Sequence, residues 1–88
     1  MRTVEKLEEL TALAERMGYQ IRYEPLAGTG GVCEFGGKQW LFVDLNLNVA
    51  ERLELITESL RDDPSLPTGE LSEELRAHFG FLNRRSAA

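Results

Sequence analysis

The sequence contains one cysteine, one histidine and no long run of apolar residues. A single cysteine cannot form a disulfide within the chain, and this usage is typical of a reducing compartment, so we expect a cytoplasmic protein. No apolar run approaches the roughly 18 residues that cross a bilayer, and the N-terminus lacks the apolar core of a signal peptide. We therefore expect no internal disulfide and no membrane partner.

Basic residues are also scarce. The chain has 10 lysines and arginines against 15 aspartates and glutamates, which gives a net charge of −5. Such a charge repels a phosphate backbone, so nucleic-acid binding would require a compact basic patch. The only basic cluster is the NRR of residues 83–85, which is too short to form one. We expect no nucleic-acid partner.

The length of 88 residues leaves room for one hydrophobic core. Apolar residues make up 42% of the chain, which is ordinary for a globular domain. We predict a single domain over residues 1–82 and a disordered tail over residues 83–88. A core of this size gives modest stability unless the chain self-associates, so a homodimer is one expectation.

Three segments have the apolar spacing of amphipathic helices. The first covers residues 4–17, where Thr3 can cap the N-terminus and Gly18 can adopt the left-handed conformation that ends a helix. The last covers residues 70–79, and Gly80 follows it as a terminator. The apolar stripe of this last helix is predicted to be Leu71, Leu75, Phe79 and Leu82.

The middle helix begins after Asn48, and Glu51 three positions later makes the start close to a capping box. The aspartates and proline of residues 62–64 end it. Its predicted buried stripe consists of Val49, Leu53, Ile56 and Leu60.

Three strands are predicted between the first two helices. Residues 19–24 alternate between apolar and polar side chains, and residues 32–35 and 38–45 follow on either side of Gly36 and Gly37. Two glycines in succession favour a two-residue hairpin, because both central positions of such a turn need positive φ. The predicted order is α-β-β-β-α-α. We expect an α+β fold in which a small three-stranded antiparallel meander is packed by helices.

The third predicted strand has apolar side chains on both of its faces. Trp40 and Phe42 lie on one face, and Leu41 and Val43 lie on the other. Helices on one side of a small sheet can cover only one face, so the other face needs the last helix or a partner. We therefore predict that these four residues include an interaction face, used by a second copy or by another protein.

The single cysteine and the single histidine form the other candidate site. Cys33 and His78 can act as a thiol–imidazole pair if the fold brings them together. Their positions in the sequence do not establish that geometry, and a small cysteine in a strand more commonly serves packing. Glu58 is the third candidate, and a solvated surface residue is its more common role.

Residues 28–60 resemble the core of the ImmA/IrrE family of zinc-peptidase-like proteins. The sequence GVC at residues 31–33 is similar to the first strand of that core, and LFVD at residues 41–44 is similar to the second. RL at residues 52–53 stands where the family has an arginine and an aromatic residue. TESLR at residues 57–61 falls on the family's HExxH motif.

The resemblance implies a relative that lacks the metal site. In the family, two imidazoles one helical turn apart hold Zn²⁺, and the glutamate takes a proton from the metal-bound water. Thr57 and Arg61 replace both histidines here, and only Glu58 remains. A hydroxyl is a poor zinc ligand and a guanidinium repels a cation, so we expect no cofactor and no zinc hydrolysis. Glu58 and Arg61 are expected to form a surface ion pair.

Two functions therefore remain open. The favoured one is a non-catalytic protein-interaction or structural module, derived from a zincin-like core, that acts through the exposed sheet face. The alternative is a hydrolase remnant or a small-ligand-binding domain that uses a groove near Glu58, Cys33 and His78. A stable dimer without metal favours the first function, and tight zinc stoichiometry favours the second.

Overall fold

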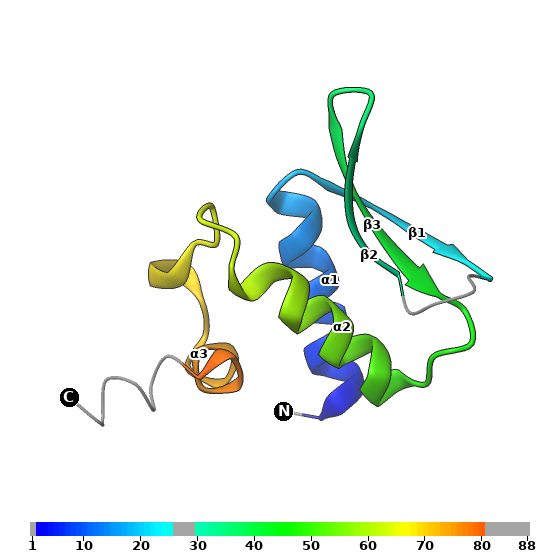
Figure 1. Ribbon diagram of the computed structural model, residues 1–88. Coiled ribbons are helices and arrows are strands. Elements are labelled where there is room, and N and C mark those ends of the chain that lie inside the picture. Colours follow the sequence, from blue (N-terminus) through cyan, green and yellow to red (C-terminus); the bar gives the residue numbers. More distant parts are fainter. Residues whose placement is uncertain (1, 26–29, 81–88) are drawn as a thin grey trace.

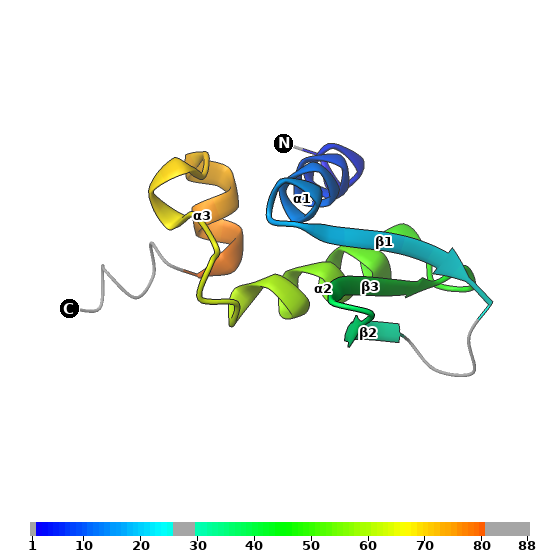
Figure 2. The same cartoon turned by 90° about the horizontal axis from the view of Figure 1, so that it is seen from above.

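The structure is a computed structural model that describes residues 2–25 and 30–80 (Figure 1). It is an α+β fold in which two helices pack on one face of a three-stranded mixed sheet (Figure 2). Within these residues no helix is long and apolar enough to cross a membrane. The predicted tail and Leu82 lie outside the described residues. The elements in chain order are α1 (Thr3–Arg16), β1 (Tyr19–Glu24), β2 (Gly30–Phe35), β3 (Lys38–Asp44), α2 (Val49–Arg61), the 3-10 helix η1 (Thr68–Glu70) and α3 (Glu73–Phe79).

Helix α1 begins and ends one residue earlier than the predicted range of 4–17. Gly18 follows it with a φ of 103°, which confirms the left-handed terminator. The prediction that Thr3 caps the helix is wrong, because Thr3 is already helical and Arg2 occupies the cap position. The backbone N–H of Arg2 donates to the Glu5 carboxylate at 3.2 Å, so the glutamate provides a hydrogen-bond acceptor for the N–H of the cap residue.

Helix α2 has the predicted capping box. The Asn48 Oδ1 accepts from the Glu51 N–H at 2.8 Å, and the Asn48 N–H donates to the Glu51 Oε1 at 2.9 Å. The buried stripe is confirmed except at Val49, which lies in the first turn and is 39% exposed. The buried residues of this helix are Leu53, Ile56, Thr57 and Leu60.

The predicted antiparallel meander is wrong in its strand order. The order is β1-β3-β2, with β3 antiparallel to β2 and parallel to β1. Strand β3 has apolar side chains on both faces, and a central strand has a neighbour on each side and the most shielded position in the sheet. The more polar β1 therefore pairs with the free side of β3 instead of with β2. In a meander every neighbouring pair of strands is antiparallel, whereas the neighbouring pair β1–β3 is parallel.

The β2–β3 hairpin is confirmed. Gly36 and Gly37 have φ values of 63° and 76°, and Phe35 pairs with Lys38 across the turn. Positive φ at both central residues is the conformation of a type I′ turn, whose twist matches that of the strands that it joins.

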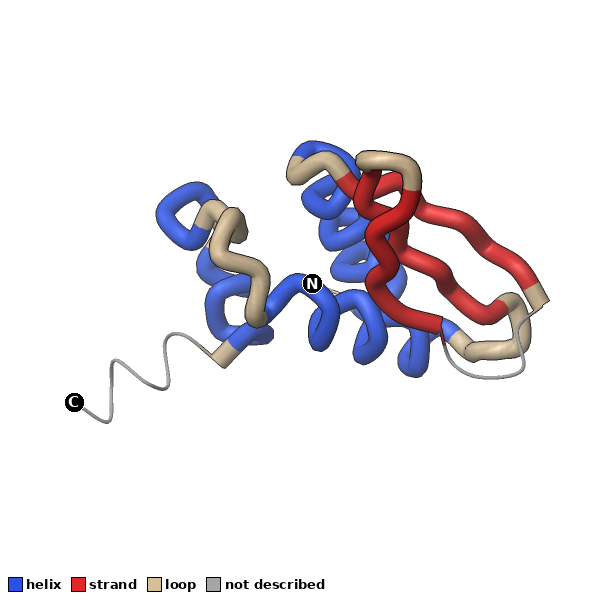
Figure 3. The backbone as a smooth tube through the Cα atoms, turned by 45° about the horizontal axis from the view of Figure 1, so that its top comes forward, coloured by secondary structure: helices blue, strands red, loops and turns tan. Residues whose placement is uncertain are grey.

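The last predicted helix is shorter than expected and lies away from the sheet. Residues 68–70 form the separate 3-10 turn η1, and the Ser72 hydroxyl accepts from the Leu75 N–H at 3.2 Å to start α3 afresh. Gly80 ends α3 with a φ of 89°, as predicted. Figure 3 shows α3 on the side of α2 that is distant from the strands.

The core lies between the sheet and the helices. Leu75 and Phe79 extend it from α3, which lies beside α2 and leaves the second face of the sheet open (Figure 1). The side chains of this core that are fully buried are Leu10, Leu13, Leu41, Val43, Ile56, Leu60 and Phe79.

Candidate functional site

The side of the sheet that faces away from α1 and α2 carries a cluster of aromatic side chains. Residues that pair directly across strands point to the same face. Trp40 pairs with Cys33, and Phe42 pairs with Arg22. Phe35 is two residues from Cys33, so it shares this side. We call this surface the outer face, formed by Arg22, Cys33, Phe35, Trp40 and Phe42.

The aromatic rings of the outer face are held in a defined arrangement. The ring centroids of Trp40 and Phe42 are 6.1 Å apart, and their planes differ by 21°. The Arg22 guanidinium lies 5.7 Å from the centroid of the Trp40 ring, a cation–π contact. The Trp40 Nε1–H donates to the Phe35 carbonyl at 3.3 Å. These contacts order the indole at the surface.

The outer face is open and mostly apolar. Its five residues line a shallow depression of about 360 Å³. Phe35 is 74% exposed at the end of the hairpin, and Trp40 and Phe42 are half-buried. Leu41 and Val43 lie on the opposite face, are fully buried and pack against the helices. Of the four residues predicted for an interaction face, only Trp40 and Phe42 are therefore accessible.

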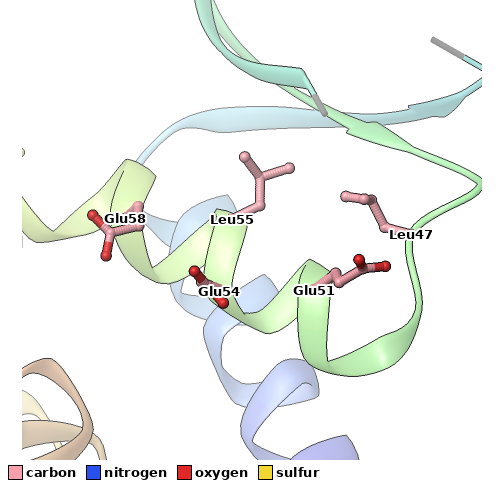
Figure 4. Close-up of a pocket in the computed structure, with 5 residues that line it drawn as sticks. All are labelled: Leu47, Glu51, Glu54, Leu55 and Glu58. Carbon is pink, nitrogen blue, oxygen red and sulfur yellow. The ribbon is translucent and has the colours of Figure 1, made fainter. Parts of the chain in front are cut away.

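A second concave surface lies along α2. It is an open groove of about 350 Å³ beside the sheet. Figure 4 shows two leucines pointing into this space and three glutamates along the flank of the helix. We call it the α2 groove, lined by Leu47, Glu51, Glu54, Leu55 and Glu58.

Glu58, one of the three candidates for the predicted groove, forms a surface ion pair. Its Oε1 lies 2.7 Å from the Arg61 Nη1, and the Glu58 side chain is 63% exposed. This contact confirms the predicted pair between positions three residues apart on a helix.

His78 lies against the same stretch of α2. The Thr57 hydroxyl donates to the Leu53 carbonyl at 2.6 Å, so its oxygen is left to accept from the His78 Nε2–H at 2.7 Å. Burial lowers the pKa of His78, and the positive charges of Lys6 and Arg61 lower it further. The hydrogen bond from His78 to Thr57 joins α3 to α2.

Cys33 lies apart from the other two candidates of the predicted groove. Glu58 and His78 line one shallow pocket on α2, whereas Cys33 is exposed on the outer face. The structure therefore brings His78 and Glu58 to one surface and places the thiol on another, so the thiol–imidazole pair is not formed. Within residues 2–25 and 30–80, no group of three histidine, cysteine, aspartate or glutamate side chains could hold a metal ion.

Several surface residues were not predicted from the sequence. Arg22 is one of the alternating polar residues of the first predicted strand, and only its register against Phe42 places it over the indole of Trp40. Leu55 could have been predicted as a surface residue from the sequence, because it is apolar and lies off the buried stripe of α2. Such a residue often marks a second surface of a helix.

Comparison of the chain with models of protein families, with curated proteins and with solved structures finds no match. What these surfaces can do therefore follows from their own geometry.

Proposed function

We propose that the protein is a non-catalytic protein-interaction module and that the outer face is its contact surface. The observation that carries this proposal is the position of Trp40 and Phe42 on a sheet face that no helix covers in the described part of the chain. Complete burial of one large apolar side chain contributes roughly 1.5–3 kcal/mol. Covering both rings together with Phe35 therefore favours association by several times the thermal energy.

A second copy of the chain is the occupant that we propose, in an isologous homodimer. The margin of the outer face carries both signs of charge, since Arg22 and Glu24 form an ion pair at 2.7 Å and Lys38 lies at the start of β3. A twofold contact uses the same patch on both copies, and this mixture allows opposite charges to meet. The small core of an 88-residue chain also gains stability from such a contact.

The proposal includes an origin from a zincin-like core without its metal site. Thr57 is engaged by the Leu53 carbonyl and by His78, and Arg61 is engaged by Glu58, so both former ligand positions have structural roles. The cytoplasm is the compartment that we propose, because the exposed thiol of Cys33 fits a reducing environment.

Small-ligand binding or residual hydrolysis on α2 is the second candidate. The observation in its favour is the imidazole of His78, which lines one pocket with Thr57, Glu58 and Arg61 and whose pKa is lowered by burial. This pocket has a volume of about 260 Å³ and is open to solvent. Stoichiometric zinc in the purified protein would favour this candidate over the interaction module.

Analytical ultracentrifugation at micromolar concentration tests the homodimer. We expect a dimeric wild type and a folded Trp40→Lys variant whose dissociation constant is at least tenfold higher, which is about 1.4 kcal/mol. Val4→Lys is the matched control, because Val4 is 54% exposed on α1 and lies away from the outer face. Leu41→Lys should unfold the chain, since Leu41 is fully buried. A wild type that stays monomeric would contradict the homodimer.

A further inference from the structure

The outer edge of β2 has a row of backbone groups that no described strand pairs with, and the Glu34 carbonyl has only a long contact with the Cys33 thiol, at 4.0 Å. Among the described strands β2 pairs only with β3. A two-residue turn closes on a pair that exchanges both backbone hydrogen bonds, here Phe35 and Lys38, and such pairs alternate along an antiparallel ladder. The N–H and C=O groups of Val32 and Glu34 therefore point away from β3.

Of the features that usually protect an edge strand, this edge has only the inward-pointing charge of Glu34. Such strands commonly carry lysine, proline or a bulge, which prevent pairing with another chain. β2 has the sequence GGVCEF and contains neither lysine nor proline. Val32 is 46% exposed and Phe35 is 74% exposed, so both faces of the edge present apolar surface.

The α2 groove lies on the inner side of this edge and is acidic. Helix α2 contacts β2 as well as β3, so a strand added to β2 would lie along the flank of α2 that Figure 4 shows. Glu34 points to the same inner side, because it pairs with Gln39 and alternates with Cys33. In the described part of the chain, Glu58 pairs with Arg61, but no ion pair engages Glu34 or Glu54.

We propose that β2 accepts an extended peptide as a fourth strand and that this peptide alternates basic and apolar side chains. Successive side chains of the added strand point to opposite faces of the sheet. Its basic side chains would lie over Glu34, Glu54 and Glu58, and its apolar side chains would lie beside Phe35 on the outer side. Backbone hydrogen bonds give such a complex its affinity, and the side chains give it specificity.

The charge of the groove argues against other occupants. A second copy of the chain carries a net charge of −5 and would place Glu34 close to its own equivalent across a twofold axis. The phosphates of a nucleic acid would meet the same carboxylates. This inference goes beyond the proposed homodimer, because Val32 and Glu54 are not part of the outer face.

Fluorescence anisotropy of labelled peptides tests the inference. The probe is an alternating lysine–valine peptide of roughly eight residues, within the usual range of strand lengths. Its controls are a peptide of the same composition with the lysines and valines in two blocks, and an alternating glutamate–valine peptide. We expect the alternating basic peptide to bind at least tenfold more tightly than either control.

Two variants locate the binding surface, each with a matched control. Glu54→Lys should weaken binding at least tenfold, whereas Glu8→Lys makes the same charge change on the exposed side of α1 and should weaken it less than twofold. Val32→Pro removes an N–H that faces solvent, which an edge strand tolerates, and should abolish binding. Val32→Thr keeps that N–H and should retain binding.

Equal binding of the alternating and block peptides, or full binding by Val32→Pro, would overturn the inference. If Val32→Pro lowers the melting temperature, two peptides that are N-methylated at alternate residues replace that variant. The peptide whose methylated positions face β2 should fail to bind. Full binding of both N-methylated peptides would also overturn the inference. The homodimer is judged separately, because Trp40→Lys leaves Val32 and Glu54 unchanged.

Discussion

At the residue scale, Tyr19 and Asp63 form the contact that joins the start of the sheet to the loop after α2. The Tyr19 hydroxyl donates to the Asp63 Oδ2 at 2.5 Å, and the Asp63 Oδ1 accepts from the N–H and the hydroxyl of Ser65 at 2.8 Å each. Burial, together with the hydrogen bond and charge of Asp63, raises the pKa of Tyr19 to about 12. The hydrogen bond from Tyr19 lowers the pKa of Asp63, and the two from Ser65 act in the same direction against burial.

We predict that Tyr19→Phe lowers the free energy of unfolding by about 1.5–3 kcal/mol, since a hydrogen bond to a charged group contributes that much. Urea denaturation at neutral pH measures the change. Tyr23→Phe is the matched control, because Tyr23 lies on the same strand and is 43% exposed. Its stability should stay within about 0.5 kcal/mol of the wild type. Equal stability of wild type and Tyr19→Phe would show that the contact does not stabilise the fold.

The pH dependence of this contact has a defined sign. Folding raises the pKa of Tyr19, so its contribution is complete below the unfolded value of about 10 and is lost as the pH rises toward 12. Folding lowers the pKa of Asp63, so its contribution is present above the ordinary carboxyl range and is lost as the pH falls through the lowered pKa. Tyr19→Phe should therefore remove the alkaline loss from the stability profile.

At the element scale, the β2–β3 hairpin is the part of the sheet that local sequence determines most completely. Gly36 and Gly37 have positive φ, and a Cβ atom added at either position would meet no other atom within 4 Å. The constraint at this turn is therefore the backbone conformation and not the available space.

We predict that Gly36→Val combined with Gly37→Val destabilises the protein by roughly 2 kcal/mol or more, because left-handed conformations are strained for β-branched residues. Thermal unfolding followed by circular dichroism measures the loss. Gly69→Val is the matched control, since Gly69 also has open space around it but does not have positive φ. Wild-type stability in the double variant would show that the turn does not depend on these glycines.

The strand order is the element-scale feature that could not be predicted from neighbouring residues. Sequential strands often pair, and β1 and β2 are consecutive. The apolar side chains on both faces of β3, such as Trp40 and Leu41, did indicate that this strand needs cover on both sides. The structure places β3 in the centre and covers Leu41 with helices, whereas Trp40 lies on the outer face, which no helix covers in the described part of the chain.

At the scale of the whole molecule, α2 lies next to the single histidine. Under the proposed zincin-like origin, Thr57 and Arg61 stand at the two ligand positions, and His78 lies 2.7 Å from the Thr57 hydroxyl. The charged guanidinium of Arg61 opposes a cation at this place.

We predict that protein purified without chelator contains far less than one zinc per chain, and that chelator leaves its melting temperature unchanged. Elemental analysis and a thermal melt measure both quantities. Close to one zinc per chain would end this prediction and would favour the hydrolase alternative.

The matched variant for that measurement is Thr57→His together with Arg61→His. It restores two imidazoles one helical turn apart, with His78 beside the first of them. If the resemblance reflects ancestry, this variant should bind zinc and gain thermal stability from it. A variant that folds and binds no zinc would count against the zincin-like origin.

The sequence by itself determined the local features of this protein. The capping box of Asn48 and Glu51, the terminators Gly18 and Gly80, and the glycine turn all depend on residues within a few positions of one another. Each is decided by backbone conformation or by a hydrogen bond that closes locally, so a short window of sequence is sufficient to predict it.

Only the tertiary structure decided which residues are brought together across the chain. Tyr19 and Asp63 lie 44 positions apart, and nothing local to either residue indicates the other. The same holds for Cys33 and His78, which only the alternative hypothesis placed in one groove and which the fold places on different surfaces. Burial of one common core decides such placements, because it depends on how all the helices and strands pack at once.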